Sequence, residues 1–141
     1  MEKTILTENE LNQVAGGTGA GAVLSSGSFT SNSGTHVDLL VNWAVRADNY
    51  GTKTLYVDVA VTSYALYNSG VNVDLTANGI LYTATSTTIR YGGSARVTNP
   101  LASFVVPNVV GPVSLSVVWH FNGTLSGVPV RDIRASGMAM A

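Results

Sequence analysis

Pro112-Val113-Ser114-Leu115-Ser116-Val117-Val118-Trp119-His120-Phe121 is the stretch that decides the fold of this chain. Successive side chains of a β-strand point to opposite faces of its sheet, so a strand here has one apolar and one polar face. The apolar face includes Trp119 and Phe121, while the polar face carries serines and His120. The pattern predicts a half-buried strand with Trp119 in the protein core.

Similar runs recur along the rest of the chain after residue 21. Short strands with turn signals every 8–12 residues, and no helical period between them, are typical of all-β domains. The expected strands cover residues 22–29, 37–46, 55–62, 71–77, 80–84, 104–106, 112–121 and 130–140. We therefore expect a single all-β domain over residues 22–141, with about eight strands.

Asn78-Gly79 separates two of these runs and predicts a two-residue hairpin with a type I′ turn. In that hairpin Ala77 would pair with Ile80. Residues 85–100 show no alternation, and Gly92-Gly93 and Asn99-Pro100 interrupt them. One polar face per strand favours antiparallel pairing. The sequence thus predicts an antiparallel β-sandwich, with a closed barrel as the alternative.

The composition narrows the function classes. The chain has 141 residues, a net charge of −1, no cysteine and only 11% charged residues. Binding to nucleic acid needs a clustered basic surface, which the scattered Lys and Arg do not provide, so we expect no nucleic-acid partner. Without cysteine, thiol catalysis and Cys-based zinc sites are excluded. No apolar run approaches the ~20 residues of a membrane span, so none is expected.

The first turns of the chain carry strong signals for a short helix. Thr7 and Glu10 form a capping box, in which each side chain can bond to the backbone N–H of the other. Leu6 and Leu11 stand at the positions of the hydrophobic staple that accompanies such a cap. The helix would end at the following glycine pair. A helix this short is unstable alone in water, so it should order only against a partner.

The same segment resembles the double-glycine leader family, which precedes class II bacteriocins and related exported peptides. The matching residues are Leu6, Thr7, Glu10, Leu11, Val14, Gly16 and Gly17. The resemblance implies that a peptidase-containing ABC exporter grips the apolar stripe and cuts after Gly17. Residues 1–17 would then be the leader peptide and residues 18–21 a Gly-rich spacer. The mature, secreted protein would begin at Thr18.

A second resemblance covers roughly Val37 to Ala141. The order of strand, Asn-Gly hairpin, irregular loop and Val-rich strand, followed by Trp119-His120-Phe121-Asn122-Gly123 and a closing Ser136-Gly137 strand, is similar to immunoglobulin-like domains of phage tail and surface-adhesion proteins. This likeness concerns pattern and turn placement and includes no catalytic motif. It implies an immunoglobulin-like β-sandwich.

Candidate ligand-binding residues are few. Asp38, Asp58 and Asp74 each alternate onto the polar face of a predicted strand, where they could converge on a calcium ion or form a paired-carboxylate site. A solvated polar face is the alternative. Tyr56, among other tyrosines, could add a sugar-binding ring. His120 is expected on the surface, and no serine lies in a G-x-S-x-G context, so we expect no catalytic site, metal or cofactor.

These features favour a secreted, non-enzymatic protein that either binds a partner such as a cell-surface carbohydrate or assembles with itself. In either case a bacteriocin-like role is expected from the leader resemblance. The alternative is a phage-tail-like or fibre subunit that keeps its N-terminal arm and docks it on a neighbouring subunit. A hydrolase built on Asp38, Asp58 and Asp74 is a third hypothesis, and it requires the three carboxylates to meet in one cleft.

Overall fold

A computed structural model describes residues 22–31, 37–48, 50–121, 123–125, 128–130 and 132–141. All regular structure in these residues is β, as the alternating pattern predicts, and no described segment is a helix that could span a membrane. The strands are β1 (Val23–Thr30), β2 (Val37–Ala47), β3 (Lys53–Ser63), β4 (Leu66–Asn68), β5 (Asn72–Ala77), β6 (Ile80–Thr85), β7 (Ile89–Tyr91), β8 (Val97–Val106), β9 (Pro112–Trp119), β10 (Gly123–Leu125), β11 (Val128–Val130) and β12 (Ile133–Met140).

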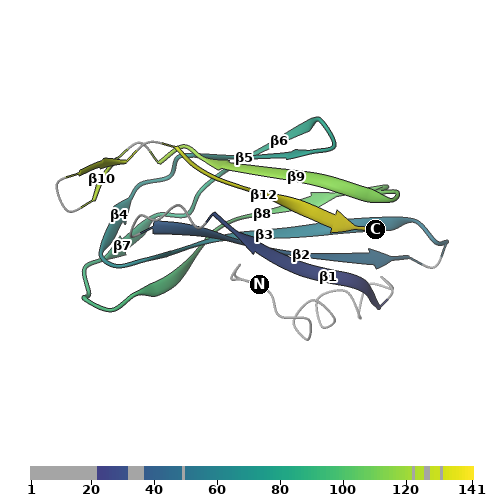
Figure 1. Cartoon of the computed structure of the whole chain (residues 1–141), viewed down its shortest axis with the longest axis horizontal. Coiled ribbons are helices and arrows are strands. Elements are labelled where there is room, and N and C mark those ends of the chain that lie inside the picture. The colour runs from purple at the N-terminus through teal and green to yellow at the C-terminus, as the bar shows by residue number, and fades with distance from the viewer. Residues whose placement is uncertain (1–21, 32–36, 49, 122, 126–127, 131) are drawn as a thin grey trace.

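Two antiparallel four-stranded sheets form the body of the protein (Figure 1). We call the sheet with strand order β1-β2-β3-β8 the first sheet and the sheet with order β12-β9-β5-β6 the second sheet. The inward side chains of both sheets make one apolar core. The remaining described strands pair as two small ribbons, β4–β7 and β10–β11. The arrangement is sandwich-like, and the predicted antiparallel all-β class is confirmed.

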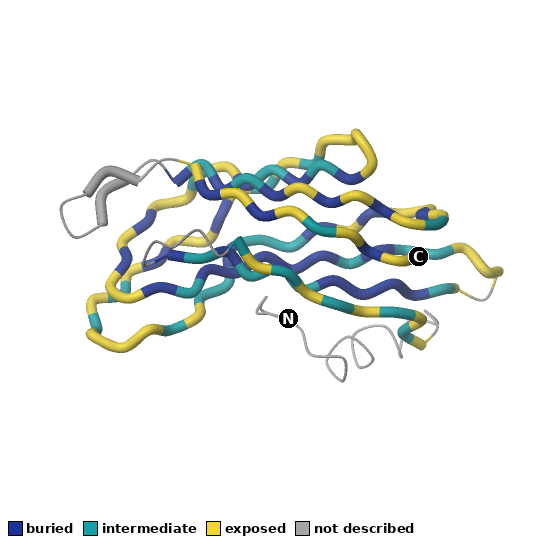
Figure 2. Tube along the Cα trace, in the orientation of Figure 1, coloured by how far each residue is buried: buried dark blue, intermediate teal, exposed yellow. Residues whose placement is uncertain are grey.

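The predicted alternation appears directly in the burial of β9 (Figure 2). Leu115 and Val117 are at most 1% exposed and Trp119 is fully buried, whereas Ser114 and Ser116 face solvent. The ring centroid of Phe121 lies 4.8 Å from that of Trp119. The segment quoted first from the sequence is therefore a central strand of the second sheet.

The β5–β6 hairpin has the predicted turn and register. Asn78 and Gly79 have φ angles of 47° and 85°, the left-handed conformation that a type I′ turn requires at both positions. Ala77 pairs with Ile80 as expected. The Asn78 side chain also reaches β9, where its Oδ1 accepts from the Ser114 N–H at 2.8 Å. The hairpin is thus tied to its sheet by a side chain as well as by strand pairing.

Residues 85–100 are more regular than the sequence predicts. They contain β7 and the start of β8, which runs through Pro100. Pro100 is tolerated because β8 is an edge strand and the pairing register shifts beside it, between Val59 and Ala60. The last strand also begins at Ile133, later than expected, because residues 128–130 pair with β10 instead.

The two ends of the sandwich differ (Figure 1). At one end the chain makes three longer connections, residues 64–71, 86–96 and 120–132, which carry the two small ribbons. We call this the loop end. The opposite end, which we call the turn end, has the tight turns β2–β3, β5–β6 and β8–β9. The start of β1 and the end of β12 also meet there, where the Ser25 hydroxyl donates to the Met140 carbonyl.

Candidate functional site

Several polar and aromatic side chains outside the apolar core lie at the loop end. Binding residues commonly lie on loops that a rigid scaffold positions. Three groups of described residues lie at or near this end. They are an ionic row on the outer face of the second sheet, the β4–β7 ribbon with its neighbouring arginines and tyrosines, and a group around Asp38 on the first sheet.

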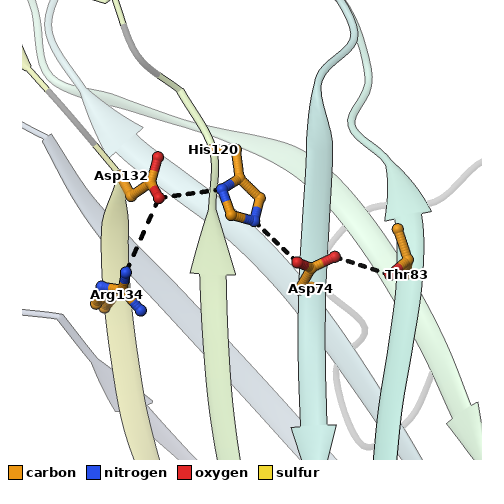
Figure 3. A network of polar contacts seen from close by, with 5 residues as sticks. All are labelled: Asp74, Thr83, His120, Asp132 and Arg134. Carbon is orange, nitrogen blue, oxygen red and sulfur yellow. Dashed lines mark hydrogen bonds and ion pairs between the residues drawn. The ribbon is translucent and has the colours of Figure 1, made fainter.

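His120 is the centre of the ionic row (Figure 3). It follows β9 directly, and its Nε2 lies 2.8 Å from Asp74 Oδ2 on β5. Its Nδ1 lies 3.0 Å from Asp132 Oδ2, just before β12. On the far sides, Thr83 on β6 donates to Asp74 at 2.8 Å, and the Arg134 guanidinium lies 3.9 Å from Asp132. The row therefore links side chains on β5, β6 and β12 to His120, the residue directly after β9.

The row stabilises the charged form of each partner. The hydrogen bond to His120 is the main cause that lowers the pKa of Asp74, with help from Thr83 and against the effect of burial. The hydrogen bond to Asp74 is likewise the main cause that raises the pKa of His120, supported by Asp132. An imidazolium donates from both ring nitrogens, which fits a ring placed between two carboxylates.

This geometry joins strands and leaves the imidazole no free nitrogen. Both ring nitrogens of His120 contact carboxylates, so neither is available to take a proton from a neighbouring hydroxyl. The hydroxyl of Thr83 bonds to Asp74 instead of the ring. The chemistry that the row supports is an electrostatic link between strands on an exposed face.

The β4–β7 ribbon presents a second cluster at the same end. Leu66 and Ile89 are buried, and between them Tyr67 and Arg90 form a cross-strand pair that faces outward. Tyr67 is 65% exposed. A surface cavity of about 240 Å³ lies against Tyr67, Asn68, Ser69, Thr88, Ile89 and Arg90.

A buried hydrogen-bond network connects the end of β4 with the segment that precedes β7. The Ser86 hydroxyl oxygen accepts from Asn68 Nδ2 at 3.1 Å and from the Val71 N–H at 3.0 Å. Asn68 also donates to the Thr87 carbonyl at 3.3 Å. Asn68 and Ser86 are both less than 10% exposed. Because buried polar groups without partners are costly, this network fixes the connections on both sides of the ribbon.

Asp38 belongs to a third group near the loop end, on the first sheet. Arg96 bonds to its carboxylate at 2.7 Å, and Ser31 bonds to it at 3.1 Å. The Arg96 guanidinium lies 6.0 Å from the ring centroid of Tyr64, at the outer limit of a cation–π contact. Arg96 is thus neutralised locally by Asp38.

The three aspartates of the sequence analysis do not converge. Asp38 and Asp58 lie on the outer face of the first sheet, and Asp74 lies on the outer face of the second, so the sandwich separates them. The paired-carboxylate and calcium interpretations are therefore wrong for this trio. Across the described residues, no three His, Asp or Glu side chains are placed to hold a metal ion.

Asp58 also differs from its expected solvated position. It is only 6% exposed and accepts a hydrogen bond from Ser103 on β8. Tyr56 is half-buried on the same face and packs against Ala44. Both residues therefore serve local packing in the first sheet, and neither lies at the loop-end cavity.

The leader residues predicted to contact an exporter lie outside the described residues. They are Leu6, Thr7, Glu10, Leu11, Val14, Gly16 and Gly17. The sequence alone missed Arg90 and the partners of His120. Their proximity follows from the β4–β7 and β5–β9 pairings, which join segments distant along the chain.

Comparison with protein-family models, curated proteins and solved structures finds no match to this chain.

Proposed function

We propose that this chain is the precursor of a secreted, non-enzymatic binding protein, exported and cut after Gly17 by a peptidase-containing ABC transporter. The observation that carries the proposal is the leader pattern, in which seven residues stand in register at Leu6, Thr7, Glu10, Leu11, Val14, Gly16 and Gly17. The first described strand begins at Val23, so a cut after Gly17 leaves every described strand intact.

The direction of the first described strand supports the proposal. β1 begins at the turn end, where Val23 pairs with Arg46 beside the β2–β3 turn. The loop end, with Tyr67 and Arg90, lies at the other extreme of the long axis (Figure 1). The first strand after the proposed cleavage site therefore begins at the end of the domain opposite the β4–β7 ribbon.

We further propose that the sandwich is immunoglobulin-like, and the strand connectivity supports this. In that fold, strands A, B and E share one sheet, while G, F, C and C′ share the other. Here β2, β3 and β8 correspond to A, B and E, and β12, β9, β5 and β6 correspond to G, F, C and C′. The added edge strand β1 is a departure. With this correspondence, the B–C and F–G connections both lie at the loop end, where variable domains bind their ligands.

A cleavage assay tests the leader part of the proposal. Full-length chain treated with the peptidase domain of a double-glycine exporter should yield a fragment that begins at Thr18. Leu11→Ser should slow cleavage strongly, because it removes the centre of the apolar stripe, and Gly17→Val should abolish it. The neighbouring Asn12→Ser, outside the pattern, should cleave at the native rate. Equal cleavage of Leu11→Ser and Asn12→Ser would contradict the proposal.

Self-association is a second candidate for the mature domain, favoured by edge strand β6. Ile80 and Leu81 on this strand are each 61% exposed, at the free edge of the second sheet. Unpaired edges with apolar side chains tend to pair with other chains. Leu81→Lys should then lower the apparent mass in analytical ultracentrifugation, whereas a native chain that sediments as a monomer at all concentrations would exclude assembly through β6.

A further inference from the structure

The cavity beside the β4–β7 ribbon has the composition of a small ligand site. Its volume is about 240 Å³, and the residues that line it are Tyr67, Asn68, Ser69, Thr88, Ile89 and Arg90. Ligand sites characteristically pair an apolar surface with a few polar groups that set orientation. Tyr67 is the aromatic residue of this lining, and it is 65% exposed.

The hydroxyl end of the Tyr67 side chain lies against Gly92. A Cβ atom at Gly92 would lie 2.6 Å from the Tyr67 hydroxyl oxygen, so the phenol end of the ring occupies space that any other residue would fill. Gly92 was conspicuous in the sequence only as a breaker of the strand pattern. Its absent side chain lets the ring rest against the backbone and remain exposed. A ring that packs against backbone on one side loses less conformational entropy on binding than a fully free ring.

Among the arginines that the structure describes at the loop end, Arg90 is the one without a counter-charge. Arg96 is paired with Asp38 at 2.7 Å, and Arg134 lies 3.9 Å from Asp132. His120 lies between two carboxylates. No ion pair joins Arg90 to any residue that the structure describes, and its side chain is exposed beside the cavity. An exposed, uncompensated guanidinium on the wall of a cavity is suited to an anion, above all to a planar carboxylate that it can bind through two parallel hydrogen bonds.

Tyr67 and Arg90 also have a fixed spacing. They are directly opposed across the antiparallel β4–β7 pair, where Cβ atoms lie about 5 Å apart. A hexose ring stacked on the tyrosine would bring a carboxylate carried by that ring within reach of the guanidinium. Ser69 and Thr88 would then be near the ring hydroxyls, where they can donate or accept hydrogen bonds.

We infer that this cavity binds a carboxylate-bearing sugar, with Tyr67 stacking on the ring and Arg90 binding the carboxylate. The inference rests on the proposed extracellular binding function and specifies its ligand class. Uronic acids and sialic acids share the required chemistry. Neutral sugars lack the anion, and simple carboxylates lack the apolar ring face.

A surface cavity at the turn end is less suited to such a ligand. It measures about 270 Å³ and lies at the turn end, against Gly51, Thr52, Lys53, Asn108, Val109 and Val110. It has a cation in Lys53 but no aromatic ring. It therefore serves as an internal control, together with Tyr50, which is 92% exposed on the neighbouring turn.

An NMR titration of the full-length, ¹⁵N-labelled chain tests the inference. Tri-galacturonate and sialyllactose are the two acidic ligands, and methyl-esterified tri-galacturonate and lactose are their neutral counterparts. We expect amide shifts at residues 67–69 and 88–90 with at least one acidic ligand, and at least about tenfold weaker binding of its neutral counterpart because a charge-assisted hydrogen bond is lost. Which acidic ligand binds more tightly identifies the source of the carboxylate.

Matched variants separate the roles of the two side chains. Tyr67→Ala should weaken binding by about tenfold through loss of ring contact. Arg90→Gln should weaken acidic binding by about tenfold or more and leave neutral sugars unaffected. Tyr50→Ala and Lys53→Gln, at the turn end, should bind as the native chain does. Because Tyr67 and Arg90 are exposed, all four variants should keep the native amide spectrum elsewhere.

The outcomes distinguish the inference from the proposed function. Native affinity in Tyr67→Ala and Arg90→Gln, shifts at the Lys53 cavity instead, or no shift with either acidic ligand would overturn the inference. Cell-surface binding by the native chain that survives both substitutions would do the same, while leaving the binding function standing. A chain that binds an acidic sugar but is never exported or cleaved would overturn the proposed function alone.

Discussion

His120 shows at the residue scale how an exposed face of this protein is held together. Its ring nitrogens lie 2.8 Å and 3.0 Å from the carboxylates of Asp74 and Asp132. These groups, with Arg134 beside Asp132, are the described charges that face it. His120 is 39% exposed in its side chain, so solvent screens these contacts and the free energy at stake is small.

The pKa shifts give this row a defined pH dependence. Because the pKa of His120 is raised above 6.5, its contribution to stability is complete below that pH and is lost as pH rises through the raised pKa. Because the pKa of Asp74 is lowered from 3.8, its contribution is present above that pH and is lost as pH falls through the lowered pKa. His120→Gln should therefore lower the unfolding free energy most at pH values above the pKa of Asp74 and below the pKa of His120. We expect that loss to be at most about 1 kcal/mol.

Urea unfolding at pH 5.5 and pH 9 measures this effect. The difference in unfolding free energy between the native chain and His120→Gln should shrink at the higher pH, where the native ring is neutral. A difference of the same size at both values would show that the ring acts through packing. The sequence predicts that His120 lies on the surface, but it does not predict the contact with Asp74. That contact depends on the β5–β9 pairing, which joins residues distant along the chain.

Ser86 is the residue on which the geometry of the loop end depends most. Its hydroxyl serves both Asn68 and the Val71 N–H in a buried position. Ser86→Ala should lower the unfolding free energy by about 1–3 kcal/mol, because it leaves buried donors unpaired. Ser116→Ala, on an exposed face, should stay within about 0.5 kcal/mol of the native value. Chemical denaturation compares the pair, and equal effects of the two substitutions would contradict the assigned role of Ser86.

At the scale of elements, the β5–β6 hairpin separates two sources of turn stability. Gly79 has a φ of 85°, so Gly79→Ala should cost about 1 kcal/mol through backbone strain alone. Asn78→Gly keeps the permitted φ but removes the side-chain bonds to the Pro112 carbonyl and the Ser114 N–H. We expect it to loosen the hairpin from β9 while the turn itself persists. Amide exchange at Ser114 reports the second effect, and unchanged protection there would show that Asn78 contributes only its backbone conformation.

Strands in which apolar and polar residues alternate regularly were predictable from the sequence. Strands interrupted by glycine or proline were not. In β9 and the β5–β6 hairpin, the apolar period, the turn residues and the final register all agree. β7 and the first half of β8 escaped prediction because glycines and Pro100 interrupt the pattern there. The structure accommodates them with an edge position, a register shift and side-chain hydrogen bonds, none of which leaves a periodic signal.

At the scale of the whole molecule, the proposed function depends on a division between residues 1–17, proposed as a leader, and the domain that follows. Every described strand lies beyond Gly17, and the described sheets enclose one apolar core. A chain that begins at Thr18 should keep the same fold and lose less than about 1 kcal/mol of unfolding free energy, since no described strand is removed. Calorimetry of the two forms checks this. A large loss in the shortened chain would mean that residues 1–17 are part of the folded body.

The candidate site also belongs to this scale, and the sequence predicted it least well. It predicted aspartates on polar strand faces, but Asp38 and Asp74 lie on opposite sides of the sandwich. Tyr67 and Arg90, by contrast, meet only because two short strands from separate connections pair at the loop end. A single sequence gives alternation within a strand but not the choice of neighbouring strand.

The mass of the protein recovered from the culture medium of its producing cells tests the central claim most directly. We expect a species that begins at Thr18, with the uncut chain accumulating inside cells when the exporter's peptidase is inactivated. Recovery of only the Met1 form outside the cell, or unchanged release without the peptidase, would contradict it.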